Sequence, residues 1–438
     1  MKTTVEDISS VKKKILVEID TKNVDKKIND AYKRVGKSAS IKGFRPGKIP
    51  LKILERYYGQ QVMEEVTNSL IQESLPEAIQ ETETYPLNMP VIENETLLVK
   101  GQDYKYAAIM EVRPEFELKD YLGMEVEKEK CVIEEKDIDS QIESILKSQG
   151  TLKSIEEDRK IAKDDYVIIN YEGFEGDEAV TDLKADNFSL ALEEGNFYPG
   201  FIDELIGEKK GSKKEFTINF EEDYINSRLA GKAISFKVEI TDIKEMVLPE
   251  LNEEFVKGLG LEFDNIDQLR EKIKEDLTAR EEKRLDNQVK SDLLEKIAES
   301  VEFELPESLI QSEIDNSMEN MRQGLLRSGA NFETLGLDQE KMKNDLKPAA
   351  EKNVKGALIL GEITRLNDLD IDEKEIQKGF EDMAREAGYP AETVRKYYES
   401  NNLLDTFRQT LLKEKTLNYL VENASVTEVE PAENKEDD

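Results

Sequence analysis

The chain has 438 residues, with 62 Lys and Arg against 97 Asp and Glu, so its net charge is −35 at pH 7. It contains no histidine and one cysteine, Cys131, which excludes histidine-dependent catalysis, histidine-ligated metals, cysteine-cluster zinc sites and intrachain disulfides. The length predicts roughly two to four domains. We expect no cofactor, no metal site and an inert, half-buried thiol at Cys131.

Three features indicate where the protein works. The N-terminus lacks the continuous apolar run of a secretory signal. No apolar stretch approaches the ~18 residues of a membrane-spanning helix. A chain that forms no disulfides also suits a reducing compartment. We therefore expect a cytoplasmic protein without a membrane partner.

Charge is distributed unevenly along the chain. Residues 1–60 contain 15 Lys and Arg against 7 Asp and Glu, a net charge of +8, whereas residues 61–438 contain 47 against 90, a net charge of −43. A basic head on an acidic body indicates that the first 60 residues contact an anionic partner, either RNA or an acidic protein surface. Chance clustering of lysines on a solvated face is an equally good alternative at this stage.

The first elements predict a compact α+β domain over residues 1–112. Apolar residues alternate in the strand-like segments and recur every three or four residues in the helical ones. We expect strands at 11–20, 85–92 and 104–113, and helices at 22–37 and 51–80.

An eight-residue loop separates the two helices of this domain. It reads Gly43-Phe44-Arg45-Pro46-Gly47-Lys48-Ile49-Pro50, and two glycines with two prolines exclude both helix and strand. Phe44 lies at the tip of this turn, next to Arg45 and Lys48, so the loop suits docking on RNA or on a protein surface beside RNA. In the alternative interpretation, Phe44 packs into its own domain and the loop is structural.

Residues 113–154 are predicted to connect this domain to the next. The connector has an extended part at 124–133, followed by an acidic helix with Ile138 and Ile142 on one face. Residues 155–245 then change character, because short alternating segments are separated by glycine-rich turns. A small antiparallel β domain follows from strands at 166–171, 187–192, 214–220 and 233–243, with a short helix at 201–206.

Residues 246–423 are predicted to be almost entirely helical. Apolar residues recur every three or four positions without a strict heptad, which favours packed arms over one long coiled coil. Met318, Met321, Leu325 and Leu326 are candidates for adaptable apolar surface, although periodicity does not separate such residues from core. Residues 424–438 are acidic and predicted to be disordered.

The loop at 43–50 resembles the ribosome-docking signature of the bacterial trigger factor family, and the order of domains is similar to that family over essentially the whole chain. The resemblance implies docking on the large ribosomal subunit near the exit tunnel, on protein and rRNA, and binding of nascent and unfolded polypeptides. The implied docking residues are Gly43, Phe44, Arg45, Pro46, Gly47, Lys48, Ile49 and Pro50. Some family members have a third cation where this chain has Pro46.

The segment 155–245 resembles an FKBP-type peptidyl-prolyl isomerase. The resemblance implies an apolar pocket for proline lined by Tyr171, Phe188, Phe197, Tyr198, Phe201, Tyr224, Leu229 and Phe236. Isomerisation needs no nucleophile or metal, since its barrier of about 18–20 kcal/mol is amide resonance and a dry pocket can lower it. Val180 and Thr181 depart from the residues common in that family. An ordinary aromatic core is the alternative from composition alone.

Taken together, the resemblances imply a multidomain α+β protein with a ribosome-binding domain, an FKBP-like domain and a helical chaperone domain. Such a protein holds nascent chains open, assists folding and export, and isomerises X-Pro bonds without ATP. No phosphate-binding Gly-x-x-x-x-Gly-Lys-Ser/Thr loop is present. A homodimer of the free protein is one expected assembly. The alternative function is a free FKBP-type isomerase whose helical region only mediates dimerisation.

Overall fold

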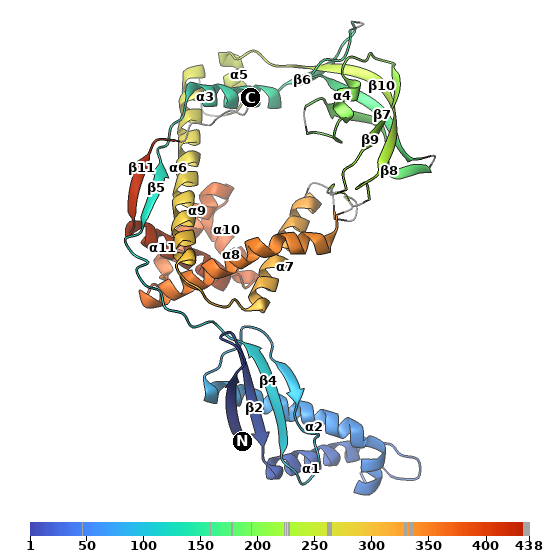
Figure 1. Cartoon of the computed structure of the whole chain (residues 1–438), viewed down its shortest axis with the longest axis vertical. Helices are drawn as coiled ribbons and strands as arrows, with labels where there is room; N and C mark the ends of the chain where they lie inside the picture. The colour runs from blue at the N-terminus through green and yellow to red at the C-terminus, as the bar shows by residue number, and fades with distance from the viewer. Residues whose placement is uncertain are drawn as a thin grey trace. The chain divides into compact units, whose positions relative to one another are not determined.

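The computed structural model describes residues 1–431 except for Pro46, Asp158, Asp177, Glu194, Asp223, Ile225, Ser227, 261–264, 328–330 and 333–336. The side chains of Thr181, Asp182 and Glu386 are also outside the described residues. The structure therefore does not test the expectations for Pro46 and Thr181. Two compact units make up the chain: Met1–Tyr121 with Leu294–Ser317 and Leu346–Thr416, and Leu122–Leu293 with Met318–Asp345 and Leu417–Asp438. Figure 1 labels the helices and strands in chain order.

The N-terminal domain is an antiparallel sheet with the strand order β1-β2-β4-β3, packed against two helices (Figure 1). Its elements are β1 Lys2–Asp7, β2 Lys12–Ile19, α1 Thr21–Ser38, α2 Leu51–Thr82, β3 Val91–Asn94 and β4 Tyr104–Glu111. Ile15, Val17 and Ile19 of β2 are buried, as the two-residue period of a strand requires. They form one core with apolar residues of α1 and α2. Asp20 begins α1, because its side chain accepts a hydrogen bond from the backbone N–H of Asn23.

Two predictions for this domain were incomplete. The strand predicted at 85–92 exists only as Val91–Asn94, because Pro86 and Pro90 have no N–H to donate to a ladder. Strand β1 was not predicted at all. Five of its six residues are exposed, so it shows none of the apolar alternation that identifies a half-buried strand.

The middle domain is a five-stranded antiparallel sheet with the order β6-β10-β7-β8, in which β9 also pairs with β10. Its elements are β6 Thr151–Ser154, β7 Tyr166–Glu175, β8 Glu178–Ala191, α4 Phe201–Leu205, β9 Lys213–Asn219 and β10 Ala233–Val247. The predicted antiparallel domain with one short helix is confirmed. The exposed strand β6 was not predicted. Phe201 and Leu205 of α4 are buried in the same core as the inward residues of β7 and β10.

The remaining chain is mainly helical, as predicted. Its elements are β5 Glu125–Glu129, α3 Glu135–Ser148, α5 Glu253–Gly258, α6 Ile266–Glu299, α7 Glu307–Arg327, α8 Gln339–Leu366, α9 Glu373–Ala387, α10 Ala391–Ser400, α11 Leu404–Glu422 and β11 Ser425–Val429. Ile138 and Ile142 of α3 are buried against residues of α5 and α6. A capping box between Asp372 and Glu375 fixes the start of α9.

The prediction that residues 424–438 are disordered is wrong for the first part of this segment. Residues Ser425–Val429 form β11, which pairs in parallel with β5. The backbone N–H of Ser425 donates to the carbonyl of Met124 over 2.9 Å, and Ala424 packs against a small core around Val126. The alternating Ser-Val-Thr-Glu-Val sequence suits a strand, but its partner lies 300 residues away in sequence. Residues 432–438 are outside the described residues.

Candidate functional sites

The middle domain gathers an aromatic cluster at one end of its sheet. Tyr171 comes from β7, Phe188 from β8, Phe201 from α4 and Phe236 from β10. The loop that leads into α4 adds Phe197 and Tyr198, while Tyr224 and Leu229 come from the segment before β10. All eight predicted pocket residues pack on one core, so the structure brings the whole predicted set together.

Phe201 lies at the centre of the cluster. Its ring centroid is 4.6 Å from that of Phe197, 5.1 Å from Phe216 and 5.3 Å from Phe236, in edge-to-face arrangements that aromatic quadrupoles favour. Phe201 and Phe236 have no exposed surface, whereas Phe197 is half-buried. The cluster therefore has fully buried members, here called the floor, and partly exposed members, here called the rim.

Two glycines lie next to residues of this floor, for different reasons. Gly200, directly before α4, has a φ of 73°, a left-handed conformation that costs glycine little. Gly173 on β7 is required by lack of space, not by its backbone conformation. A Cβ there would lie 2.8 Å from Leu183 Cβ and 3.2 Å from Phe236 Cε1. A side chain at position 173 would therefore clash with Leu183 and crowd the Phe236 ring.

The rim also carries hydroxyl groups. Burial raises the pKa of Tyr171 and of Tyr224 above the ordinary tyrosine value. Both phenols are consequently protonated at neutral pH and able to donate a hydrogen bond to a carbonyl oxygen. The described residues of the cluster include no nucleophile and no ionised group, so the chemistry that these side chains offer is desolvation, shape and hydrogen bonding.

Two aromatic residues of this cluster were missed in the sequence. Phe216 on β9 contacts Phe201, and Phe220 lies 5.8 Å from Tyr198 and 4.7 Å from Tyr224 between ring centroids. Both lie on the face that Ile218 also occupies, and this two-residue spacing was the available signal. Val180, a noted departure from the family, is half-buried against the same core.

A partly buried ion pair lies next to the start of the loop that carries Phe197 and Tyr198. Both Arg159 guanidinium Nη atoms donate to the Asp165 carboxylate over 2.7 Å, and the N–H of Ala162 donates over 2.8 Å. Burial acts to raise the pKa of Asp165, but these hydrogen bonds outweigh it, so the pKa is lowered. The Asp165 carbonyl accepts from the N–H of Leu192, where the loop begins.

The loop at 43–50 lies at the surface of the N-terminal domain. Gly43 and Gly47 have φ of 95° and 81°, and the N–H of Gly47 donates to the carbonyl of Gly36 in α1 over 2.9 Å. Phe44 is 39% exposed to solvent, so it is not buried in the core of its own domain. Arg45 and Lys48 are exposed beside it.

The other residues of this loop hold it in place. Ile49 packs on the core of the N-terminal domain, and Pro50 precedes the first turn of α2, where a missing N–H costs nothing. Beside the loop, a groove of about 620 Å³ is lined by residues that include Tyr32, Lys33 and Leu54. The combination is a rigid turn that presents one aromatic and two cations to solvent.

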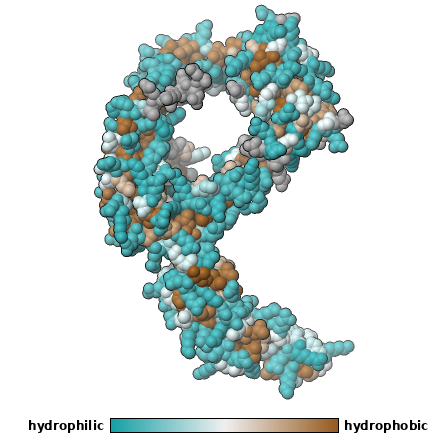
Figure 2. Space-filling view, viewed as in Figure 1, coloured by the Kyte–Doolittle hydropathy of each residue, from teal (hydrophilic) through white to brown (hydrophobic). Residues whose placement is uncertain are grey.

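The candidate apolar surface on α7 divides into core and surface residues. Met318 is buried, whereas Met321 and Leu326 are 44% and 47% exposed and Leu325 is half-buried. On the face drawn in Figure 2, hydrophobic residues are dispersed among hydrophilic ones. Apolar residues scattered in this way are ordinary on a protein surface and do not by themselves mark a binding site.

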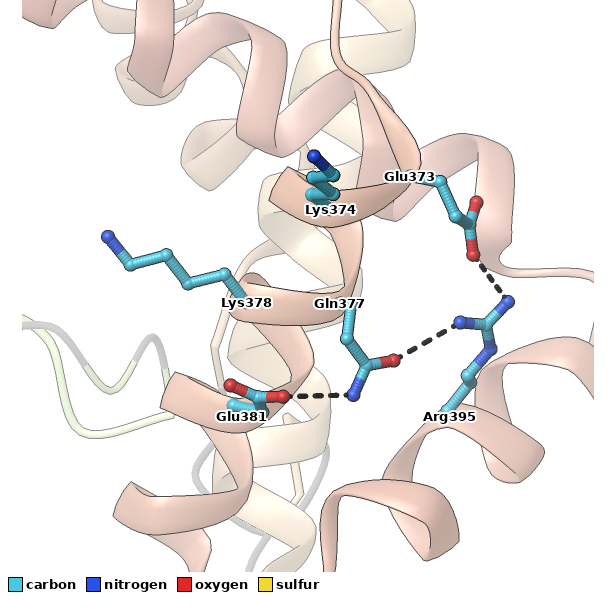
Figure 3. Close-up of a pocket in the computed structure, with 6 residues that line it drawn as sticks. All are labelled: Glu373, Lys374, Gln377, Lys378, Glu381 and Arg395. Atoms are coloured by element: carbon cyan, nitrogen blue, oxygen red, sulfur yellow. Dashed lines mark hydrogen bonds and ion pairs between the residues drawn. The ribbon is translucent and has the colours of Figure 1, made fainter.

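The groove on α9 and α10 and the thiol of Cys131 show no arrangement of side chains suited to catalysis. A shallow groove of about 410 Å³ on α9 and α10 is polar, and its Arg395 is bonded to Glu373 and Gln377 (Figure 3). Cys131 is half-buried, and burial raises the pKa of its thiol, which lowers its reactivity. Within the described residues, no cluster of three or more potential metal ligands occurs.

Comparison with known proteins adds three family matches. Residues 1–145 match the bacterial trigger factor protein, residues 265–422 match its C-terminus, and residues 157–241 match FKBP-type peptidyl-prolyl cis-trans isomerase. The trigger factor of Syntrophotalea carbinolica is 35% identical over 98% of this chain and 97% of the relative. That of Geotalea daltonii is 33% identical over 99% of both chains.

A solved structure of a trigger factor chaperone has the same fold. It covers 96% of this chain and 99% of its own, with a TM-score of 0.50 and 20% sequence identity. Among the described residues, no helix is both long enough and apolar enough to cross a bilayer.

Proposed function

The chain belongs to the trigger factor family, and we propose that it docks at the ribosomal exit tunnel, holds emerging chains open without ATP and isomerises their X-Pro bonds. The family and its FKBP-type domain establish a chaperone with a peptidyl-prolyl isomerase domain. The docking site, the reaction at the pocket and a cytoplasmic location are the proposed parts.

The observation that carries the docking proposal is the exposure of Phe44, Arg45 and Lys48 in one surface loop. An exposed phenylalanine is energetically unfavourable unless a partner covers it, and Arg45 and Lys48 supply charge for phosphate or carboxylate. The loop belongs to residues 1–60, whose net charge is +8 against −43 for the rest of the chain. An exposed aromatic residue and an exposed arginine in one loop are the residue types that interface hot spots favour.

Co-sedimentation with ribosomes tests this docking. We expect the double variant Phe44→Ala/Arg45→Ala to lose most of its binding. The matched control Tyr85→Ala/Arg113→Ala also removes one exposed aromatic and one exposed arginine from the N-terminal domain, and should bind like the parent. Equal binding by the parent and the Phe44/Arg45 variant would refute the docking site.

The isomerase proposal follows from the apolar floor and the protonated rim. A prolyl ring that packs on Phe201 and Phe236 leaves bulk water, which removes solvent stabilisation of the polar, planar amide. A hydroxyl such as that of Tyr224 can hold a neighbouring carbonyl while the C–N bond rotates. The pocket lowers a rotational barrier, so the absence of a nucleophile is no obstacle.

A proline-limited refolding assay tests the pocket. Phe201→Ala and Tyr224→Ala should each slow catalysed refolding. Phe174→Ala is the matched control, since Phe174 lies on β7 outside the aromatic cluster, under the ammonium group of Lys237. If both pocket variants catalyse at the parental rate, the pocket assignment fails. The rival function, a free isomerase with a dimerisation region, leaves the trigger factor match of residues 1–145 unexplained.

A further inference from the structure

Helix α7 begins without a cap of its own. The carbonyl of Pro306 accepts the first helical hydrogen bonds, from the N–H groups of Leu309 and Ile310, so Pro306 occupies the N-cap position. Proline has no side-chain acceptor there. The backbone N–H of Ser308, in the first turn, therefore needs a partner from elsewhere in the chain.

That partner is Glu111, the last residue of β4. Its Oε2 accepts from the Ser308 N–H over 2.8 Å, across 197 residues of sequence. Glu111 is only 8% exposed, and no ion pair to it is found in the described part of the chain. A buried carboxylate without a cation is costly, but a helix N-terminus offers both N–H donors and positive potential.

Two more contacts lie beside this one. Ser10 Oγ donates to Glu304 Oε2 over 2.8 Å, and hydrogen bonds from Ser10 and Ser9 lower the pKa of Glu304. The rings of Phe116 and Phe303 are stacked, with centroids 4.1 Å apart and planes 4° apart. All of these residues belong to the first compact unit. Residues 303–308 thus contact the turn before β2, the end of β4 and the chain that follows it.

We propose that Glu111 is a positioning residue that caps α7 in place of a local side chain and thereby fixes the orientation of the N-terminal sheet on residues 303–308. The Ser10–Glu304 hydrogen bond is exposed, so water competes for it, and the Phe116–Phe303 contact is apolar, whereas the hydrogen bond from Ser308 to Glu111 is part-buried and directional. Glu111 therefore supplies the directional part of the joint. The inference concerns this joint alone and stands whether or not residues 43–50 dock on the ribosome.

Pulsed EPR distances in the full-length chain test the proposal. Spin labels are placed at Asn68→Cys on α2 and Asn316→Cys on α7, both exposed positions, in a Cys131→Ala background that removes the single native cysteine. The parent should give one narrow distance distribution. Glu111→Ala should broaden it about twofold, as expected when a hinge is released. Glu111→Gln keeps an acceptor oxygen and should stay narrow.

A second variant removes the donor instead of the acceptor. Ser308→Pro deletes the N–H in the first helical turn, where proline is tolerated, and should broaden the distribution as Glu111→Ala does. The two changes combined should broaden it no further. Glu93→Ala, an exposed carboxylate on β3, is the control and should leave the width unchanged. Thermal unfolding identifies any variant that has merely lost its fold.

Two results would overturn the proposal. One is a distribution that is already broad in the parent, which means that the joint does not hold the sheet. The other is a folded Glu111→Ala variant with the parental width, which means that Glu111 does not set the orientation.

Discussion

The aromatic pocket and the loop at 43–50 place their candidate residues in opposite environments. In the pocket, Phe201 and Phe236 have no exposed surface and form part of the domain core. In the loop, Phe44 is 39% exposed and its neighbours face solvent. The buried pocket residues therefore contribute to folding as well as to the proposed function, while the exposed side chains of Phe44, Arg45 and Lys48 lie outside the domain core. Alanine substitutions of these three loop residues should change binding without changing stability, whereas alanine substitutions of the buried pocket residues should change both.

The largest effect is expected at the pocket floor. Phe201→Ala removes a fully buried ring that contacts five other rings, so the free energy of unfolding of the middle domain should fall by about 3–5 kcal/mol. Calorimetry of the full chain, with hydrogen exchange to assign the transition to β7 and β10, measures this. Phe188→Ala on the half-buried rim should cost clearly less. An equal loss for both would contradict a floor-and-rim arrangement.

The ion pair beneath the pocket loop gives the next effect. Asp165→Asn should lower the free energy of unfolding by roughly 2 kcal/mol, less than for a fully buried pair because Arg159 keeps 33% of its side-chain surface. Because the folded-state pKa of Asp165 is lowered, its contribution is present above the unfolded value of about 3.9 and is lost as pH falls through the lower folded value.

Acid unfolding of the two proteins checks this sign. The difference in stability between the parent and Asp165→Asn should be constant above about pH 5 and shrink as the pH falls below 4. A difference that grows on acidification would contradict the assignment of Asp165 as an ionised, hydrogen-bonded partner of Arg159.

A smaller effect should separate catalysis from folding within the pocket itself. Tyr224→Phe removes one hydroxyl from the rim and keeps the ring, so unfolding should be almost unchanged. The kcat/KM for a proline substrate should fall roughly fivefold, equivalent to about 1 kcal/mol for one hydrogen bond. A variant with the parental kcat/KM would remove Tyr224 from the proposed mechanism.

The smallest change in stability is expected in the loop. Lys48→Ala should alter the free energy of unfolding by less than about 0.5 kcal/mol. Ribosome binding should weaken, and the slope of log affinity against log salt should decrease in magnitude by about 0.7–0.9 if its contact is a phosphate. If binding weakens but the slope of log affinity against log salt is unchanged, Lys48 contacts ribosomal protein and not an RNA phosphate.

The sequence was informative where physical signals are local. Two glycines and two prolines identified the loop at 43–50, and alternating apolar residues located β2, β7, β9 and β10 approximately. The pocket residues span Tyr171 to Phe236, and only the family resemblance grouped them, because periodicity does not distinguish pocket aromatics from core. Phe216 and Phe220 show this limit, since their strand was predicted and their part in the cluster was not.

The remaining features depend on contacts between distant residues. The exposed strand β1 has no apolar pattern, and the pairing of β11 with β5 joins segments 300 residues apart. The cap that Glu111 provides for Ser308 is equally remote in sequence. Met318 and Met321 have the same residue type on the same helix, yet one is buried and the other exposed. Such distinctions arise from tertiary packing, which a single-sequence pattern does not encode.

The most direct measurement is a paired assay of ribosome affinity and thermal unfolding on the Phe44→Ala/Arg45→Ala variant. The account predicts that affinity falls at least about tenfold while the unfolding transition stays where the parent has it, because neither side chain contributes to the core. A variant that binds ribosomes like the parent, or that loses binding only because its N-terminal domain unfolds, would contradict the claim that this loop docks without supporting the fold.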